Sequence, residues 1–527
     1  MGKIKFTIAQ GGIGTPLPGQ DHYSGFLFDS DELPSGFDTD DRIKKILSLA
    51  AAEDLGIDNS HSDETVATGG SVEITTAGAA TEIQSIYITP TNGKKTLLGS
   101  YSVVTSDATT DVASGLVSAI NLLTSIHGYE AELSTSTVQL TAPAKQGASI
   151  NSAGLSFESK TVTGSSGTGV ATVTQFSGGV GSQIAPMHYH VSEFFRIQPG
   201  GVLWIGIYDY TSAFDATDIK DLQDYAEGQI RNIGVYLQNT YAASFITSSQ
   251  TVIDGLFLED KQIDNVYIAA DLSATTISAL TNLTSLDSEN VSLVLVEDGG
   301  GEGYRLSGVT GKSITSLGTV LGAKAFANVH ENCGWVAKFN LSGFNSSYKT
   351  TELDTIAFAT GEMYADQPVS VIGNANTPAL LTTYGYHWAK KYSGVSGSFL
   401  DTTPTCTLAS SDFARTERNS VMNKAIRLVR INETPLVNSP LYVNESTGKL
   451  DFATVETFKN AAFEALEQMA RDGEINTDTD GVLPAASVVI DPDQNVITNA
   501  AVQLTINIVP VGTAETISNT IGFKTQL

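Results

Sequence analysis

The chain has 527 residues, 29 of them basic and 57 acidic, which gives a net charge of −28 at pH 7. A chain of this length is expected to form two to four domains. The acidic balance argues against a nucleic-acid backbone as the main partner, because phosphate binding requires clustered Lys and Arg. Cys333 and Cys406 are the only cysteines, so neither a disulfide framework nor a Cys-rich zinc site is expected, and the compartment is predicted to be reducing.

The N-terminal residues predict a short strand. In residues 3–8 (KIKFTI), Ile4, Phe6 and Ile8 alternate with polar residues and lie on one side of the strand. No apolar signal segment follows the first basic residues, and no run approaches the roughly 18 apolar residues of a membrane span. We therefore expect no cleaved secretion signal and no insertion into a bilayer. Residues 40–55 have apolar positions at helical spacing before Gly56, which predicts a helix.

The composition changes abruptly over residues 63–182. Ser, Thr, Gly and Ala supply 66 of these 120 residues, and Arg, Trp, Met and Cys are absent. Alternating runs separated by Gly and Ser clusters predict strands, together with one helix at 110–126. The runs are 71–76, 84–89, 136–142 and 169–176. The contrast with both flanks predicts an inserted β-rich domain.

Apolar strands and helices alternate from residue 202 onward. Strands are predicted at 202–208, 233–237, 264–272, 291–296 and 335–341, and helices at 215–230, 274–283 and 313–328. Near-continuous apolar strands separated by helices are typical of a mainly parallel sheet that is covered on both faces.

The last third of the chain predicts two helices followed by strands. The first helix, 413–430, carries five cations against one anion, Glu417. The cations are Arg415, Arg418, Lys424, Arg427 and Arg430. A helix at 454–471 and a strand at 486–490 follow, and the chain closes with alternation over 502–508 and again at Ile517, Ile521 and Phe523.

Two loops have partial ligand-binding patterns. Gly311-Lys312-Ser313 has the ending of a phosphate loop, but Leu306 stands where the pattern requires its first glycine. Residues 476–481 (NTDTDG) have the spacing of the first half of a calcium loop, but position twelve is Ser487 instead of Glu. We predict neither a nucleotide site nor a calcium site.

Histidine and cysteine patterns are equally incomplete. His188 and His190 flank Tyr189 in an alternating stretch, which would place both imidazoles on one face, as a metal pair requires, but no third ligand is near in sequence. A structural pair is the preferred interpretation. His330 and Cys333 are one helical turn apart, without an activating context. The sequence therefore predicts no catalytic residue, no metal site and no cofactor, and the protein is not expected to be an enzyme.

Strands at both chain ends are the unusual feature. A strand at a free end leaves half of its backbone groups unpaired, and an unprotected edge attracts another chain. We therefore predict that Ile4, Phe6, Ile8, Ile517, Ile521 and Phe523 belong to arms that add strands to neighbouring subunits.

Three stretches of the chain resemble contractile tail sheath proteins of bacteriophages, in particular the Mu-like branch. They are GYHWAKKYSGVSGSFLDTTPTCTLASSDFARTERNSVMNKAIRLVR (385–430), SPLYVNESTGKLDFATVETFKNAAFEALEQM (439–469) and VQLTINIVPVGTAETI (502–517). The insert is similar to a module of phage tail proteins through SDATTDVASGLVSAINLL (106–123) and GYEAELSTSTVQLTAPAKQGASIN (128–151). The resemblance extends over about half of the chain, residues 63–160 and 384–527.

This resemblance implies a structural subunit that polymerises as stacked, homo-hexameric rings around an inner tail tube and contracts to drive the tube through a bacterial envelope. It implies a baseplate and a tail terminator as further partners, and a location in the virion after assembly in the host cytoplasm. It also makes the cation-bearing helix 413–430 a candidate for the tube contact, with the helix 454–471 as the alternative. The cations of the first helix could equally face the acidic surface of the chain itself.

The expected fold class is an α/β and α+β multidomain protein, with a C-terminal α+β core completed by both termini. The expected parts are an N-terminal strand arm (1–20), a core segment (21–62), the inserted domain (63–182), a central mainly parallel α/β domain (183–380), the C-terminal core (381–513) and a C-terminal strand arm (514–527). Two alternatives stay open. One is another phage tail or virion structural protein, and the other is an α/β enzyme with a β-rich binding insert and its site around 296–313.

Overall fold

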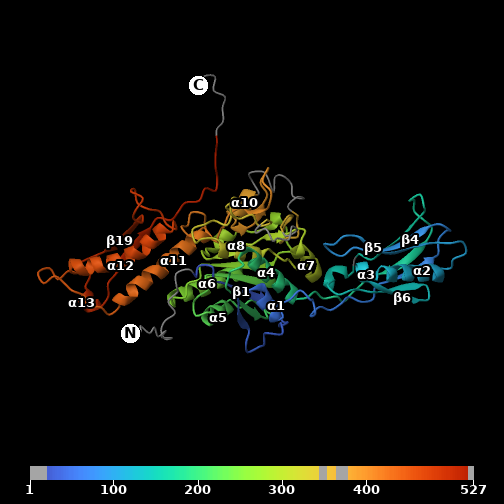
Figure 1. The fold of residues 1–527 in the computed structure, drawn as a ribbon, viewed down its shortest axis with the longest axis horizontal. Helices are drawn as coiled ribbons and strands as arrows, with labels where there is room; N and C mark the ends of the chain where they lie inside the picture. The colour runs from blue at the N-terminus through green and yellow to red at the C-terminus, as the bar shows by residue number, and fades with distance from the viewer. Residues whose placement is uncertain (1–19, 153, 344–352, 364–377, 520–527) are drawn as a thin grey trace, which may run out of the picture.

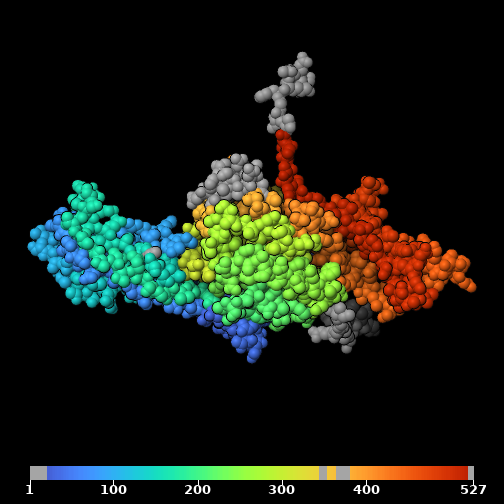
Figure 2. Space-filling view, turned by 180° about the vertical axis from the view of Figure 1, so that it is seen from behind, coloured from blue at the N-terminus to red at the C-terminus, as the bar shows by residue number. Residues whose placement is uncertain are grey.

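The computed structural model describes residues 20–152, 154–343, 353–363 and 378–519 (Figure 1). The chain is a mixed α/β protein with several sheets, which confirms the predicted class at this level. Three parts lie in a row: the β-rich insert at one end, a large α/β domain in the middle and the C-terminal helices at the other end (Figures 1 and 2).

The central domain is built on a seven-stranded sheet with the order β16-β13-β12-β11-β1-β10-β2. The parallel strands are β1 (Ser24–Asp29), β10 (Leu203–Tyr208), β11 (Asn232–Thr240), β12 (Asn265–Asp271), β13 (Val291–Val294) and β16 (Tyr386–His387). Only the edge strand β2 (Ile43–Ile46) is antiparallel to its neighbour, β10. The first strand of the described chain thus lies inside the sheet, between β10 and β11.

Helices cover both faces of this sheet, as a parallel sheet requires. In β1, Phe26 and Phe28 belong to one apolar cluster and Leu27 to the other, so successive side chains enter opposite layers. The first layer contains α1 (Leu49–Asp54), α4 (Ile184–Ile197) and α8 (Leu317–Phe326). The second contains α5 (Thr217–Tyr225) and α6 (Ala243–Leu258).

Short elements complete the central domain. They are α7 (Glu302–Thr310), α10 (Pro378–Thr383), the pairs β14 (Val296–Asp298) with β15 (Ile356–Phe358) and β17 (Ala389–Lys390) with β18 (Phe399–Leu400), and the 3₁₀ turns η2 (Ile277–Ala279) and η3 (Leu283–Leu286).

Three predictions for the central domain are wrong. The predicted helix 40–55 is the strand β2 followed by the short helix α1, because Ile43–Ile46 pairs with β10 and Ser48 caps a new helix. The predicted helix 274–283 is reduced to the 3₁₀ turns η2 and η3. The predicted strand 335–341 has no regular structure, and its alternation reflects Phe339 and Leu341 anchoring a loop in the core while Trp335 is exposed.

The insert consists of two antiparallel sheets and a helix around one core. The four-stranded sheet is β6 (Glu130–Ser134), β7 (Thr137–Thr141), β3 (Ser71–Thr76) and β9 (Val170–Thr174), and the three-stranded sheet is β5 (Thr96–Ser102), β4 (Ile83–Ile88) and β8 (Ser156–Lys160). The helices are α2 (Thr109–Leu122), α3 (Thr124–His127) and the 3₁₀ turn η1 (Gly147–Ile150).

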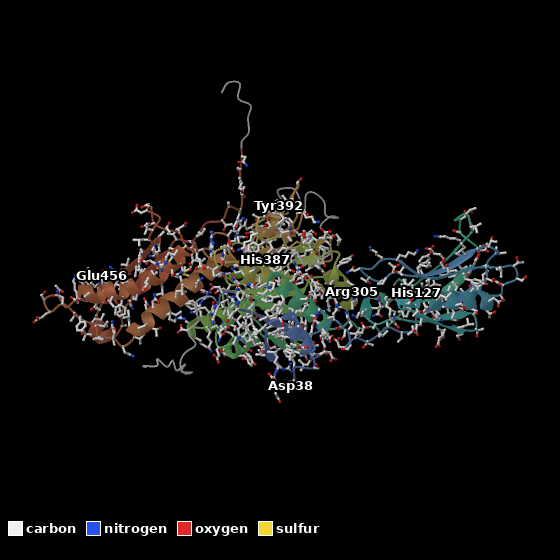
Figure 3. The ribbon with its side chains drawn as sticks, in the orientation of Figure 1. Asp38, His127, Arg305, His387, Tyr392 and Glu456 are labelled. Atoms are coloured by element: carbon white, nitrogen blue, oxygen red, sulfur yellow. The ribbon has the colours of Figure 1, made fainter. Side chains whose placement is uncertain are left out.

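Polar contacts fix the insert to the central domain. The Asp63 carboxylate accepts from the backbone N–H of Gln183 at 2.7 Å and so occupies the start of α4. Arg305, at the junction of the two parts (Figure 3), lies with Nη2 3.1 Å from His61 Nε2 and forms an ion pair with Glu302. Gly147 lies against Val309 with a positive φ, where a Cβ would clash with the Val309 carbonyl.

The C-terminal module, residues 416–510, has a core of its own. It consists of α11 (Thr416–Glu433), η4 (Thr434–Leu436), α12 (Phe452–Arg471), β19 (Ala486–Ile490), α13 (Val496–Asn499) and β20 (Leu504–Ile508). The apolar positions of α11 and α12 meet each other and the inner face of the β19–β20 hairpin in one cluster. A smaller cluster near α13 extends this core.

Candidate functional site

Open parallel sheets bind ligands outside the carboxyl ends of their strands, at the point where the strand order reverses. β1 lies between β10 and β11, so the chain adds β10 on one side of β1 and then continues with β11, β12 and β13 on the other side. A ligand is expected at the carboxyl ends of β1 and β11, where the order of strand addition reverses. The buried side chain of Asp29 lies there, with Oδ1 3.0 Å from Tyr210 N and Oδ2 2.9 Å from Gln238 N. Its carboxylate oxygens accept from the backbone, so the group holds the ends of the strands together.

In the glycine-rich region 296–313, the alternative location of an enzyme site, the polar side chains also make contacts within the central domain. Gly311 ends α7 with a φ of 70°, and Lys312 pairs with Asp271 at 3.4 Å. Ser313 donates to Ala359 O at 2.5 Å. Glu297 is 2% exposed, and burial raises its pKa to about 8. These contacts are internal to the central domain.

The prediction that His188 and His190 share a face is wrong, because both lie on helix α4 instead of a strand. Two positions apart on a helix, their side chains point in different directions. His190 is fully buried against Phe28, and burial lowers its pKa to about 3. His188 lies with Nε2 3.0 Å from a carboxylate oxygen of Glu53 on α1.

His330 and Cys333 lie in a loop instead of a helical turn. Burial raises the pKa of Cys333 to about 12, which keeps the thiol protonated and unreactive at neutral pH. In the 476–481 loop, Asp478 Oδ1 accepts from Val482 N at 3.1 Å and so stabilises a turn. Within the described residues, no three His, Cys, Asp or Glu side chains are grouped as metal ligands.

The unpaired edge of strand β20 is the most distinctive surface of the C-terminal module. β19 and β20 form a sheet of only two strands among the described residues. Val509 faces Ala485 in the register of this hairpin, and Val509 N donates to Ala485 O at 3.1 Å. These two residues therefore form a hydrogen-bonded pair. Because such pairs alternate along an antiparallel ladder, Leu504, Ile506 and Ile508 direct their backbone N–H and C=O groups away from β19.

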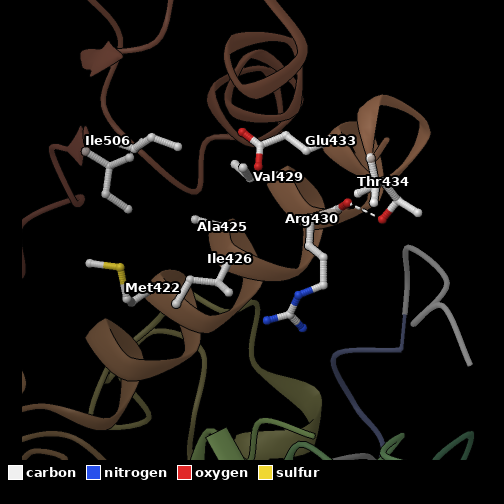
Figure 4. A pocket seen from close by; sticks show the side chains of 10 residues that line it. Met422, Ala425, Ile426, Val429, Arg430, Glu433, Thr434 and Ile506 are labelled. Carbon is white, nitrogen blue, oxygen red and sulfur yellow. Dashed lines mark hydrogen bonds between the residues drawn. The ribbon is translucent and has the colours of Figure 1, made fainter. Parts of the chain in front are cut away.

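An apolar cleft of about 380 Å³ lies beside this edge, between β20 and helix α11 (Figure 4). Its walls include Met422, Ala425, Ile426 and Val429 from the helix and Ile506 from the strand. A strand added to β20 would lie roughly 4.8 Å away from it. Its inward side chains would then enter this cleft.

The five cations of the predicted tube-facing set lie on or next to α11. Arg415 pairs with Glu515, Lys424 with Asp21 and Glu474, Arg427 with Asp21 and Asp264, and Arg430 with Asp260. Four of the five are therefore engaged inside the chain, as the alternative interpretation of this helix expects. Arg418 has an exposed side chain. Contact of this helix with a tube stays a prediction.

The chain continues past β20 as an extended segment, 511–519, that projects from the body (Figures 1 and 2). Glu515 anchors it through a two-point ion pair with Arg415, at 2.6 and 2.9 Å. Ile517 is 77% exposed and belongs to no strand within the described chain. Together with Trp335 it lines a cavity of about 800 Å³ between this segment and the central domain. Ile4, Phe6, Ile8, Ile521 and Phe523 lie outside the described residues.

The cleft beside the β20 edge was not predicted from the sequence. Met422 and Ile426 are apolar residues of the predicted helix 413–430, and they line an open cleft. In the sequence, these two residues have i, i+4 spacing and lie beside the other apolar positions of the helix. The apolar stripe of the helix is therefore wider than one partner helix can cover. Glu515 carried no signal, because its partner Arg415 is 100 residues away.

The comparisons cover part of the chain. Residues 412–527 match the family DUF2586, C-terminal domain, which corresponds to the C-terminal module and the segment after it. No curated protein matches the chain. A solved structure described as "Cryo-EM structure of the anti-feeding prophage (AFP) baseplate, 6-fold symmetrised" is similar over 64% of this chain and 80% of that chain, with 13% identity and a TM-score of 0.41. Among the described residues, no helix is both long and apolar enough to cross a membrane.

Proposed function

We propose that this protein is a structural subunit of a contractile tail sheath, of a phage or of a phage-derived injection particle. The observation that carries the proposal is the unpaired β20 edge beside an apolar cleft, on the same molecule as an extended C-terminal segment. One subunit thus presents an edge that can accept a strand, and an extended segment that can form such a strand on another subunit. Repetition of this donor-acceptor contact would generate a polymer, as strand addition does in other assemblies.

The partners follow from this proposal. Each subunit binds further copies of itself in stacked hexameric rings, and the polymer surrounds an inner tube between a baseplate and a tail terminator. The assembled location is the virion, after assembly in the host cytoplasm. The protein binds no nucleic acid directly, enters no bilayer, carries no cofactor and has no catalytic role. The use of Asp29, Lys312 and Ser313 in internal contacts supports the structural role.

The work of contraction would come from rearranged subunit interfaces. Packed interfaces favour discrete states, so an extended lattice can convert to one that buries more surface without nucleotide hydrolysis. Each backbone hydrogen bond at the β20 edge contributes about 0.5–1.5 kcal/mol. Strand pairing therefore keeps neighbours linked, while the larger interfaces decide which state is favoured.

Position 506 allows a direct test of the acceptor edge. Ile506→Ala removes apolar packing but keeps the outward N–H, whereas Ile506→Pro also removes the N–H at the free edge and leaves the β19 ladder its donors. We expect the alanine variant to polymerise weakly and the proline variant to give no long polymers in negative-stain micrographs. Equal polymer lengths for the two variants would contradict pairing at this edge.

A further inference from the structure

The last described segment of the chain, 511–519, is held at two points. The first lies just before it, where Asn476 donates from N to Val509 O at 3.0 Å and from Nδ2 to Pro510 O at 2.8 Å. The second is Glu515, which makes the only hydrogen bonds between 511–519 and the rest of the chain among the residues that the structure describes. The position of the segment therefore depends on one side chain, and past it the segment projects from the body (Figures 1 and 2).

The site that binds Glu515 is an arginine held in place by the fold. Arg415 Nε and Nη2 donate to the two carboxylate oxygens of Glu515 at 2.6 and 2.9 Å, and Thr402 Oγ1 donates to the first of these oxygens at 3.1 Å. Thr416 N donates to Thr403 O at 3.1 Å, which fixes the backbone next to Arg415. The Arg415 side chain is only 16% exposed. The site is therefore arranged in advance to receive one carboxylate through a two-point contact.

The charges around this site favour a carboxylate. Arg415 and Arg418 line a cleft of about 300 Å³ together with Glu417 and Glu515. The Glu417 carboxylate is buried and accepts hydrogen bonds from other side chains, so it does not compete for Arg415. The hydrogen bond from Arg415 is the main cause that lowers the pKa of Glu515, and the charge of Arg418 lowers it further. On a chain with a net charge of −28, such a cationic site attracts an acidic group of another copy.

The segment can leave its own site at little cost. Within the described part of the chain, residues 511–514 form no hydrogen bond with the body, and a Cβ on Gly512 would have no atom within 4 Å. Ile517 is 77% exposed, so little apolar packing opposes departure. A partly exposed ion pair contributes little free energy. The contact between Glu515 and Arg415 is therefore specific in geometry but easily exchanged.

A second copy of the chain offers the same carboxylate on the same segment. When two copies exchange an identical element, they form between chains the contacts that each chain otherwise forms within itself. The exchange loses no contact and joins two chains. A carboxylate from a second copy is thus the ligand that this site fits, because the site already binds that residue within one chain.

We propose that Arg415 binds Glu515 of its own chain in the isolated subunit and Glu515 of a second copy in the assembly. The contact within the chain holds the segment until another copy is present, and assembly replaces it by the contact between chains. Loss of the contact within the chain therefore favours association whenever a matching partner is supplied. This inference rests on the proposed function for the role of the C-terminal segment as a donor.

The test uses two charge reversals in the full-length protein, Arg415→Glu and Glu515→Arg. Neither variant alone can form the pair, within a chain or between chains. In a mixture, the unchanged Glu515 of one variant meets the unchanged Arg415 of the other, and the two reversed side chains also form a pair of opposite charges. In sedimentation velocity, the mixture should associate at a concentration about tenfold lower than either variant alone.

Two further proteins serve as controls. The double variant, Arg415→Glu with Glu515→Arg, restores the pair within one chain and should match the unmodified protein in Tm and in association. The exposed pair of Lys449 and Asp493 lies in the same module, away from the segment. A mixture of Lys449→Glu and Asp493→Lys should associate no better than either of these variants alone. Charge-reversed mixtures of Arg415→Glu and Glu515→Arg that behave in the same way would overturn the exchange.

A second measurement applies if charge reversal unfolds either variant. Separate Arg415→Cys and Glu515→Cys variants are mixed and treated with a short bismaleimide. The native Cys333 and Cys406 are buried and do not compete for the reagent. The mixture should give a two-chain product in larger amount than either variant alone, and equal amounts would overturn the exchange.

The results also separate the exchange from the sheath proposal. Association of the mixed charge reversals without cylinders in micrographs would uphold the exchange and contradict the sheath. Cylinders of normal length from Arg415→Glu or Glu515→Arg alone would contradict the exchange and leave the sheath proposal standing.

Discussion

Replacement of Glu297 by Gln should make the stability of the central domain less dependent on pH. An exposed Glu has a pKa of about 4.3, whereas burial raises that of Glu297 to about 8. The folded state therefore holds a proton that the unfolded state releases, and stability falls as the pH rises from about 4.3 to about 8. With 1.36 kcal/mol per pH unit, the loss is about 4 kcal/mol at pH 7 and about 5 kcal/mol at pH 8.

Glutamine keeps the amide oxygen in place to accept from Ile314 N, as the Glu297 carboxyl does, and it does not ionise. Urea unfolding followed by the fluorescence of the buried Trp204 and Trp388 reports on this domain. Between pH 4.3 and pH 7, the free energy of unfolding of the variant should rise by about 4 kcal/mol relative to that of the unmodified protein. Parallel stability curves for the two proteins would refute the argument and would show that Glu297 is ionised in the folded chain.

Four other predictions concern separate parts of the molecule. Met469→Ala should destabilise the C-terminal module by about 2–5 kcal/mol, measured by hydrogen exchange over 452–471, because Met469 is fully buried. The pKa of Glu82 is lowered to about 2, chiefly by the backbone N–H of Thr168, so the insert should lose stability as the pH falls from about 4.5 to about 2. Glu82→Gln should remove this pH dependence, measured by hydrogen exchange over 71–174. Glu515→Gln should increase proteolysis within 511–519, with a cost of at most about 1 kcal/mol because the pair is partly exposed. Nucleotides and sugars at about millimolar concentration should leave the Tm unchanged, and a clear upward shift would favour an enzyme.

Much of the central sheet could be predicted from the sequence, because strands buried on both faces are continuous apolar runs. The strands predicted from such runs at 202–208, 233–237 and 264–272 correspond to β10, β11 and β12. The strand β2 escaped prediction because IKKI also fits a helix, and only its pairing with β10 decides between them. The helix α6 escaped because many of its positions are Ser and Thr, which weaken the periodic signal.

The candidate site was predicted in part. The cations of α11 and the alternation of β20 are visible in the sequence, since each is a local pattern. The partners of these cations are not, because Asp21 and Arg427 are separated by 406 positions and only the fold brings them together. The His188 and His190 prediction failed for a related reason: a short alternation of polar and apolar residues also occurs on a largely buried helix.

Assembly of the purified protein tests the central claim most directly. Negative-stain microscopy of the full-length chain should show striated hollow cylinders, and deletion of residues 514–527 or 1–10 should abolish long polymers while the central domain stays folded. Particles without cylinders for the full-length chain, or cylinders of normal length for either deletion, would contradict a sheath joined by terminal strands.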